Sequence, residues 1–253
     1  MIEVQDINIS FSTEKGVNNV LNDFSFHVEK GEIVTLLGKS GCGKSTLLQI
    51  VGGFLQPDDG YVLVNGERVE EPNRNCFTLF QQNNLLPWRN IIDNVRFGLR
   101  ESKAHALQKA KEALAFVGLE KYEHHYPHEI SGGMQQRVAI ARAFALAPSV
   151  MLMDEPFAAL DTFNRYYLQE ELLRLQRKKE LTIILVTHDL EEAIYLSDRI
   201  IILRANPGKI YDIIEISLPK PRDRSSESFH HYRKQILHTF QLSSEEERLE
   251  FYI

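Results

Sequence analysis

The segment that decides the fold of this chain is Gly38-Lys39-Ser40-Gly41-Cys42-Gly43-Lys44-Ser45. It matches the pattern Gly-x-x-x-x-Gly-Lys-Ser/Thr of a phosphate-binding loop. The run Ile33 to Leu37 before it is almost entirely apolar, as expected for a strand buried on both faces. The stretch Ser45 to Val51 after it has helical character. A strand, a glycine-rich turn and a helix in this order predict a loop that binds the phosphates of a nucleoside triphosphate.

The residue types of this loop suit phosphate chemistry. Glycines let the backbone curl so that several N–H groups point into one hollow, and the helix N-terminus adds positive potential. Lys44 is expected to reach the β- and γ-phosphates, and the Ser45 hydroxyl to bind Mg²⁺. Thr46 adds a further polar group beside the phosphates. The alternative is a chance glycine turn before a helix, and the strand-turn-helix context argues against it.

A second candidate site follows the apolar run Val150 to Met153, where Asp154 and Glu155 stand side by side. A buried strand that ends in Asp at its carboxyl edge is typical of ligand sites in open α/β sheets. Asp154 is expected to hold Mg²⁺, through water, and Glu155 to polarise the attacking water as a general base. Taken alone, an acidic pair after a strand is as often a solvated turn. The phosphate loop earlier in the chain favours the catalytic interpretation.

The amino-acid composition limits the classes of protein to which this chain can belong. The 253 residues, 43% hydrophobic and 25% charged, are typical of an ordinary globular chain. The formal net charge of −6 argues against a nucleic-acid partner. Two cysteines, Cys42 and Cys76, are too few for a disulfide framework and are expected to be reduced thiols. No run reaches the length of a membrane span, so we expect a cytoplasmic protein whose membrane association comes through a partner.

The predicted secondary structure changes along the chain. Up to about residue 38 it reads as short strands, such as Ile2 to Phe11. Ala104 to Val117 and Gly133 to Ala147 are rich in helix formers and predict a helical insert. From Val150 onward strands and helices alternate, which predicts an α/β fold with a parallel sheet wrapped by helices.

The segment Ser131-Gly132-Gly133-Met134-Gln135-Gln136-Arg137 resembles the signature loop of ATP-binding cassette (ABC) ATPases. A serine and two glycines that open a helix form a second anion site, since they offer N–H groups to phosphate. The resemblance implies that Ser131, Gly132 and Gly133 bind the γ-phosphate of ATP held by the other subunit of a dimer. The alternative is an N-capped helix in which Ser131 serves only local geometry.

Other positions resemble this family in chain order. Gln81 resembles the glutamine that contacts Mg²⁺ and the attacking water, and Asp161 the acid of a loop that crosses the dimer interface. His188 resembles the switch histidine that contacts the γ-phosphate. Phe11 stands where the family has an aromatic residue that stacks on adenine, although a strand phenylalanine is as often part of a core.

The resemblance implies a P-loop NTPase (RecA-like) parallel sheet with an N-terminal antiparallel β subdomain and an α-helical insert. It covers residues 1–220, with the helical subdomain at about 90–147, and leaves 221–253 as a peripheral tail. Leu-Leu-Pro-Trp at residues 85–88, with Leu218 to Arg224, resembles ATPases of the nitrate, sulfonate and taurine importer group; importers of pyrimidine precursors look similar. An exposed Leu-Pro-Trp patch could receive a helix of a membrane partner, whereas the alternative is a packed loop with Trp88 in the core.

These resemblances imply an ATP hydrolase that energises import of a small solute, with ATP and Mg²⁺ as cofactors. The implied partners are a second ATPase subunit, two integral membrane permease subunits and an extracytoplasmic solute-binding protein, at the cytoplasmic face of the membrane. The competing hypotheses are an exporter or lipoprotein-release ATPase and a soluble ABC ATPase that acts on DNA or ribosomes. The chain shows neither a coiled-coil insertion nor a second cassette, which argues against the soluble class.

Overall fold

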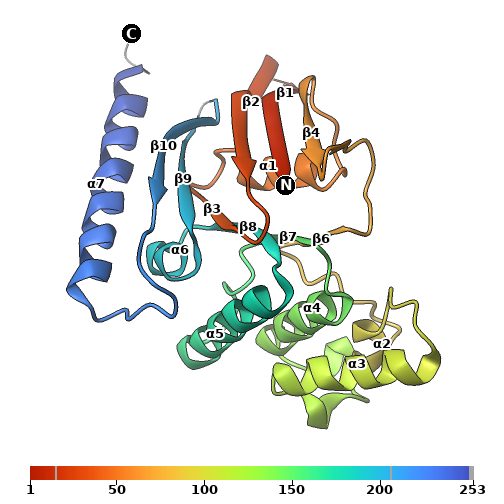
Figure 1. Ribbon diagram of the computed structural model, residues 1–253. Helices are drawn as coiled ribbons and strands as arrows, with labels where there is room; N and C mark the ends of the chain where they lie inside the picture. Colours follow the sequence, from red (N-terminus) through yellow and green to blue (C-terminus); the bar gives the residue numbers. More distant parts are fainter. Residues whose placement is uncertain (15, 206, 251–253) are drawn as a thin grey trace. The chain divides into compact units, whose positions relative to one another are not determined.

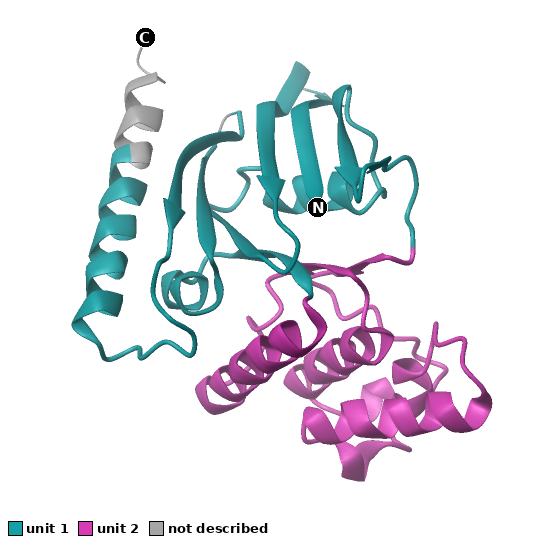
Figure 2. Ribbon diagram, viewed as in Figure 1, with its two compact units in different colours: residues 1–73, 181–253 teal, residues 74–180 magenta. Residues whose placement is uncertain are grey.

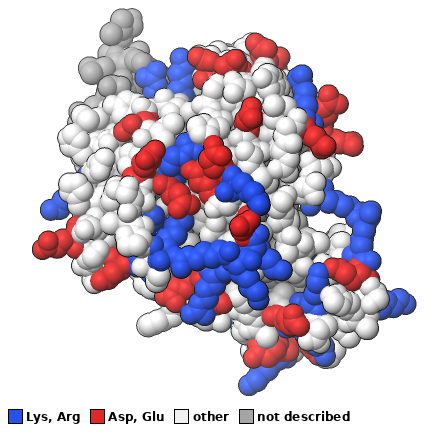
Figure 3. Space-filling view, viewed as in Figure 1, with Lys and Arg blue, Asp and Glu red and all other residues white. Residues whose placement is uncertain are grey.

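The computed structural model describes residues 1–14, 16–205 and 207–250. The chain forms two compact units (Figure 2), one made of residues 1–73 and 181–253 and the other of residues 74–180. On the face seen in Figure 3, acidic and basic side chains are interspersed. None of the helices in the described part of the chain has the length and apolarity needed to cross a bilayer.

The first unit contains an antiparallel sheet with the strand order β2-β1-β4-β5. Its strands are β1 (Ile2–Thr13), β2 (Gly16–Val28), β4 (Asp59–Val64) and the short β5 (Glu67–Arg68). Ile2, Val4, Ile7 and Ile9 of β1 are buried in its core. The predicted N-terminal antiparallel β subdomain is confirmed.

The same unit contains a second group of strands in the order β10-β9-β3-β8 (Figure 1). They are β3 (Ile33–Gly38), β8 (Thr182–Thr187), β9 (Arg199–Arg204) and β10 (Lys209–Glu215). β3 runs parallel to both β8 and β9, and β10 pairs antiparallel with β9. Every residue of β3 and β8 is buried, as expected for parallel strands covered on both faces.

Three helices belong to this unit: α1 (Lys44–Val51), α6 (Leu190–Leu196) and α7 (Glu227–Glu250). α1 contacts β8, and α6 contacts β3 and β8. The predicted C-terminal tail contains α7, which packs against α6, β9 and β10 through buried residues that include Phe229 and Ile236.

The second unit holds the parallel pair β6 (Cys76–Leu79) and β7 (Val150–Asp154). Its helices are α2 (Ile91–Val95), α3 (Lys103–Phe116), α4 (Gly132–Leu146) and α5 (Thr162–Lys179), with short 3₁₀ turns at Glu120–Tyr122 and Pro127–Glu129. α2, α3 and α4 pack against one another. The two helices predicted for the insert are therefore α3 and α4, each shifted by one residue.

Candidate active site

The phosphate loop joins β3 to α1 in the first unit, as predicted. Gly41 and Gly43 have φ values of +85° and +90°, which favour glycine over other residues. A Cβ atom on Gly38 would lie 2.5 Å from the Sγ atom of Cys42, and one on Gly43 would lie 2.6 Å from Cδ2 of Leu21. Gly43 is therefore required both by space and by backbone conformation, Gly38 by space alone and Gly41 by backbone conformation alone.

Lys44 is the first residue of α1 and is buried. Its ammonium donates to the carbonyl oxygens of Gly38 at 2.6 Å and Lys39 at 2.8 Å, so the side chain folds back over the loop. Cys42 lies beneath it, with Sγ 3.6 Å from the Lys44 nitrogen, and burial raises the pKa of this thiol. Gly43 precedes α1 and has no side chain to cap it, which leaves the first N–H groups of the helix available to an anion.

His188 emerges beside the phosphate loop. In the parallel pairing of β3 and β8, Leu37 pairs with Thr187, so Gly38 and His188 each follow a paired residue at the same edge. His188 is exposed. The Thr187 hydroxyl donates to the Glu192 carboxylate, which ties the residue before His188 to helix α6. The structure therefore brings together, within one unit, the predicted switch histidine and the start of the predicted phosphate loop.

The acidic residues belong to the second unit. Asp154 is the last residue of β7 and is buried, and Glu155 has a positive φ of +47°. Since Leu79 pairs with Met153 in the parallel register, Gln81 and Glu155 leave the same edge of the β6–β7 pair. The Gln81 amide nitrogen lies 3.4 Å from the Glu155 carboxylate, a long hydrogen bond. The structure thus places the predicted glutamine beside the predicted general base.

The predicted signature loop opens helix α4. Ser131 is the N-cap, and its hydroxyl accepts from the Met134 N–H at 3.3 Å. A Cβ atom on Gly132 would meet nothing within 4 Å, whereas one on Gly133 would lie 3.0 Å from the Ala159 carbonyl oxygen. Ser131 therefore does serve as a cap, while it and Gly132 are exposed. The local structural role and a phosphate-binding role do not exclude each other.

Asp161 is the N-cap of α5, where it accepts from the backbone N–H of Asn164 at 3.1 Å and from its side-chain amide at 2.6 Å. These two hydrogen bonds lower the pKa of the Asp161 carboxyl. Phe11 lies on β1 opposite Asn18 with 41% of its surface exposed, so it is not a core residue. The adenine-stacking interpretation of Phe11 stays a prediction.

Trp88 is 72% exposed, so the alternative that it packs in a core is wrong. The loop that carries it is held by Asn94, which is fully buried. The Asn94 side chain accepts from the Leu86 N–H at 2.7 Å and donates to the carbonyl oxygens of Leu86, Arg89 and Asn90 at 2.9 to 3.1 Å. Because Asn94 fixes the backbone from inside, the apolar Trp88 side chain is presented to solvent.

Two further polar residues of α4 were not predicted from the sequence. Gln136 is buried and donates to the Pro156 carbonyl oxygen at 2.8 Å, which holds the backbone just after Glu155. Arg142 donates to the carbonyl oxygens of Asn83 and Asn84 at 3.1 and 3.0 Å, and burial lowers its pKa. Both partners are main-chain carbonyls, which leave no signal in a sequence.

The family model described as "ABC transporter" matches residues 21–158. The chain belongs to the ABC transporter family. The matched range contains the phosphate loop, Gln81, the signature loop and the acidic pair, so the chain is an ATPase of the ATP-binding cassette kind.

Relatives and solved structures agree with this assignment. The chain is 45% identical to the aliphatic sulfonates import ATP-binding protein SsuB of Bacillus cereus, over 95% of this chain and 96% of that protein. It is 39% identical to the nitrate transport protein NasD of Klebsiella oxytoca, over 94% and 95% of the two chains. It also superposes with a TM-score of 0.80, at 28% identity, on the dimeric post-hydrolysis structure of the ATP-binding cassette MJ0796 bound to ADP and Pi, covering 87% of this chain and all of that one.

Proposed function

We propose that this chain is the ATP-hydrolysing subunit of an importer for a small solute, of the sulfonate, taurine or nitrate kind or a pyrimidine precursor. The observation that carries the proposal is the 45% identity, along 95% of the chain, to a protein named for the import of aliphatic sulfonates. The nitrate transport relative supports the same class of function, the transport of a small solute. The competing functions, an exporter-type or a soluble ABC ATPase, remain outcomes of the test below.

In the proposed mechanism, residues 38–46 bind the nucleotide. The Lys44 ammonium exchanges the Gly38 and Lys39 carbonyl oxygens for the β- and γ-phosphate oxygens, which are stronger acceptors because they are charged. The free N–H groups at the start of α1 donate to the same phosphates. Phe11, exposed on β1, is assigned to the adenine.

The oxygen donors that we assign to the metal are of the kind that binds magnesium. In residues 1–14, 16–205 and 207–250, no three His, Cys, Asp or Glu side chains gather as metal ligands. Mg²⁺ is commonly bound by few protein oxygens, together with substrate phosphates and water. Ser45, Gln81 and Asp154 are the residues that would hold it, and the buried Asp154 carboxylate favours a cation nearby. When bound, the ion neutralises charge on the phosphates.

Hydrolysis is assigned to three side chains. Glu155 acts as the general base that orients the attacking water and draws on its proton, and Gln81, which contacts the Glu155 carboxylate, positions that water. His188 contacts the γ-phosphate and stabilises its charge in the transition state. Ser131, Gly132, Gly133 and Asp161 act on the nucleotide bound by a second copy of the chain. The dimeric cassette structures support this shared arrangement.

The exposed Trp88 side chain supports a permease as the membrane partner. Phe97 is also exposed, and the Arg89 guanidinium lies 5.0 Å from the centre of its ring. Large apolar side chains held in solvent by a rigid loop are typical of a protein-binding surface. We propose that this patch, present once on each copy of the chain, receives a helix of one of the two permease subunits and so holds the chain at the cytoplasmic face of the membrane.

The test is to purify the tagged protein from native membranes in mild detergent and to identify by mass spectrometry what accompanies it. We expect a multi-span permease and a solute-binding protein, and loss of both with Trp88→Ala. The solute-binding protein is then screened against sulfonates, nitrate and pyrimidine precursors. Recovery of soluble nucleoprotein partners alone would overturn the transport proposal.

The shared-site model has a separate test. Glu155→Gln removes the general base without changing the size of the side chain, so ATP is bound but hydrolysed about a thousandfold more slowly. We expect an ATP-trapped dimer by size-exclusion chromatography with Mg-ATP. A variant that stays monomeric at saturating Mg-ATP would contradict the model.

A further inference from the structure

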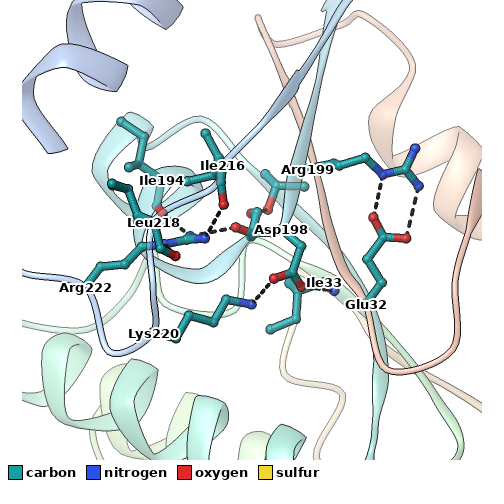
Figure 4. Close-up of polar contacts among 11 residues, drawn as sticks. Glu32, Ile33, Ile194, Asp198, Arg199, Ile216, Leu218, Lys220 and Arg222 are labelled. Atoms are coloured by element: carbon teal, nitrogen blue, oxygen red, sulfur yellow. Dashed lines mark hydrogen bonds and ion pairs between the residues drawn. The ribbon is translucent and has the colours of Figure 1, made fainter. Parts of the chain in front are cut away.

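The segment Leu218 to Arg224 has no assigned role in the mechanism, although the structure holds it firmly. It lies between β10 and α7, and Arg222 within it is buried. The Arg222 guanidinium donates to four main-chain carbonyl oxygens: Leu218 at 3.1 Å, Ile216 at 2.9 Å, Ser197 at 2.6 Å and Ile194 at 2.5 Å (Figure 4). Burial lowers the pKa of Arg222 to about 10, and Asp198 opposes this shift. The side chain is therefore still charged at neutral pH.

Two of these carbonyls belong to the end of helix α6. Ile194 lies in its last turn and Ser197 is its C-cap. The last carbonyls of a helix have no partner within it, and a cation at this end is favoured by the helix dipole. α6 has only seven residues, a length that is not stable as an isolated helix. Arg222 thus supplies, from a distant part of the chain, the C-terminal cap on which this short helix depends.

Two neighbours of Arg222 hold the same end of α6. The Lys220 ammonium lies 2.7 Å from the Asp198 carboxylate (Figure 4), and the Arg224 guanidinium lies 3.4 Å from the centre of the buried Tyr195 ring. Asp198 also accepts from the Ile33 N–H at 2.9 Å, at the start of β3. The segment is therefore connected both to α6 and to the strand that leads into the phosphate loop.

The other end of α6 holds His188. Asp189 caps the helix by accepting from the N–H groups of Glu191 and Glu192 at 2.9 and 3.1 Å. The Thr187 hydroxyl accepts from the Asp189 N–H at 3.1 Å and donates to the Glu192 carboxylate. Both chain neighbours of His188 are thus tied to the first turn of α6. A shift or fraying of this helix must move the backbone of His188.

We propose that Arg222 is a positioning residue for His188: by capping the C-terminus of α6 it fixes the helix whose N-terminal turn sets the place of the switch histidine. This inference rests on the proposed role of His188 in hydrolysis. It gives the C-terminal segment a function in the chemical step, in addition to its contribution to the fold.

The experiment measures ATP hydrolysis by the purified full chain with Arg222→Met, which keeps most of the volume and removes the charge and the donors. We expect kcat to fall about tenfold, with KM for ATP changed less than about twofold. In the His188→Ala background the same substitution is expected to change kcat less than about twofold, because residues that act as a unit are not additive. Arg177→Met, at an exposed arginine of α5, is the matched control and leaves kcat unchanged.

A purely structural role predicts a different pattern. Equal loss of kcat in both backgrounds, or a folded Arg222→Met variant with full activity, would overturn the proposal. If Arg222→Met does not fold, Arg222→Lys is used in the same cycle. It keeps the charge but cannot reach all four carbonyls at once, so we expect a smaller loss of kcat that again disappears without His188.

A second readout does not depend on hydrolysis. The ring signal of His188 in a ¹³C-labelled sample, assigned by its absence in His188→Ala, is expected to shift in Arg222→Met while that of His105 on α3 stays in place. A shift in a chain that does not hydrolyse ATP would overturn the proposed activity and leave the positioning role intact. An unmoved His188 signal in an active enzyme would overturn the positioning role alone.

Discussion

The phosphate loop, residues 38–45, and the signature loop, residues 131–133, are both glycine-rich turns before a helix, yet their construction differs. In the phosphate loop an added Cβ atom on Gly38 or Gly43 would lie within 2.6 Å of a neighbouring side chain, and Lys44 folds back onto the loop's own carbonyls. In the signature loop Gly132 faces open space and Ser131 is exposed. The phosphate loop is thus packed at Gly38 and Gly43, whereas the signature loop presents Ser131 and Gly132 to solvent. This difference fits the proposal that the signature loop acts on the nucleotide bound by a second copy of the chain.

The largest effect is expected from removing the Lys44 ammonium. Lys44→Met should weaken ATP binding about a hundredfold and lower hydrolysis about a thousandfold, since it deletes charge-assisted hydrogen bonds to the phosphates. Equilibrium dialysis with labelled ATP and a steady-state assay measure the two losses. Lys178→Met, at an exposed lysine of α5, is the control. Unchanged ATP affinity in Lys44→Met would show that the phosphate loop is not the self-contained binding site.

The signature loop is expected to fail in a different way. Ser131→Asp keeps an N-cap acceptor for α4, because Asp caps helices as well as Ser, but it adds a negative charge. In the proposed dimer this charge lies opposite the γ-phosphate of the ATP that the second copy binds, so it should lower hydrolysis about a hundredfold. ATP affinity of the single chain and the thermal midpoint should stay as they are.

Ser131→Ala separates the two roles of this serine. It loses the cap, at a cost of about 1 kcal/mol in stability, without introducing repulsion. Calorimetry should therefore show a lower thermal midpoint for Ser131→Ala than for Ser131→Asp, with the order of the hydrolysis rates reversed. If Ser131→Asp hydrolysed ATP as well as the wild-type chain, Ser131 would be a cap and nothing more.

The sequence predicted the elements to which phosphate chemistry is assigned because their residue patterns are local. The phosphate loop, the apolar run before Asp154 and the helices at 103–116 and 132–146 all lie where they were expected. β6 was missed because Cys76–Leu79 is only four residues long. β10 was missed because a register shift between Ile210 and Asp212 breaks its alternation.

What the sequence could not predict are contacts between side chains and distant main-chain carbonyls. Asn94, Gln136 and Arg222 each hold a loop or a helix by such bonds. Every residue has a carbonyl, so the partner carries no signature. The structure is needed to find these residues, and the catalytic assignments of Glu155 and His188 stay predictions until they are tested by mutation.

A third test probes the space beneath the phosphate loop. Gly38→Ala places a methyl group 2.5 Å from the Cys42 sulfur, so we expect a loss of about 1 to 3 kcal/mol in the free energy of unfolding. Gly132→Ala meets no atom and should be neutral or slightly stabilising, because alanine favours the helix that begins there. Urea unfolding measures both. Adding Cys42→Ala to Gly38→Ala should recover part of the loss, and no recovery would mean that the sulfur is not the obstacle.

The smallest expected effect is a difference in the rate at which cysteines in the two loops are chemically modified, with little change in activity. Burial raises the pKa of the Cys42 thiol above its usual range, and the nearby Lys44 ammonium only partly opposes this. At pH 8 the thiol therefore stays protonated, and since the thiolate is the reactive form, iodoacetamide should modify Cys42 slowly. Burial raises the pKa of Cys76 to about 12, so Cys76 should be modified more slowly still.

A cysteine introduced by Gly132→Cys stands in open space and should react at least about tenfold faster than either native cysteine, as followed by mass spectrometry of the labelled peptides. Its labelling rate should then fall when Mg-ATP is added, because a closed dimer covers the signature loop, while the rate at Cys42 stays low throughout. Equal rates at Cys42 and at position 132 would contradict the contrast between a closed loop and an open one, and a rate at position 132 that ignores Mg-ATP would contradict the shared site.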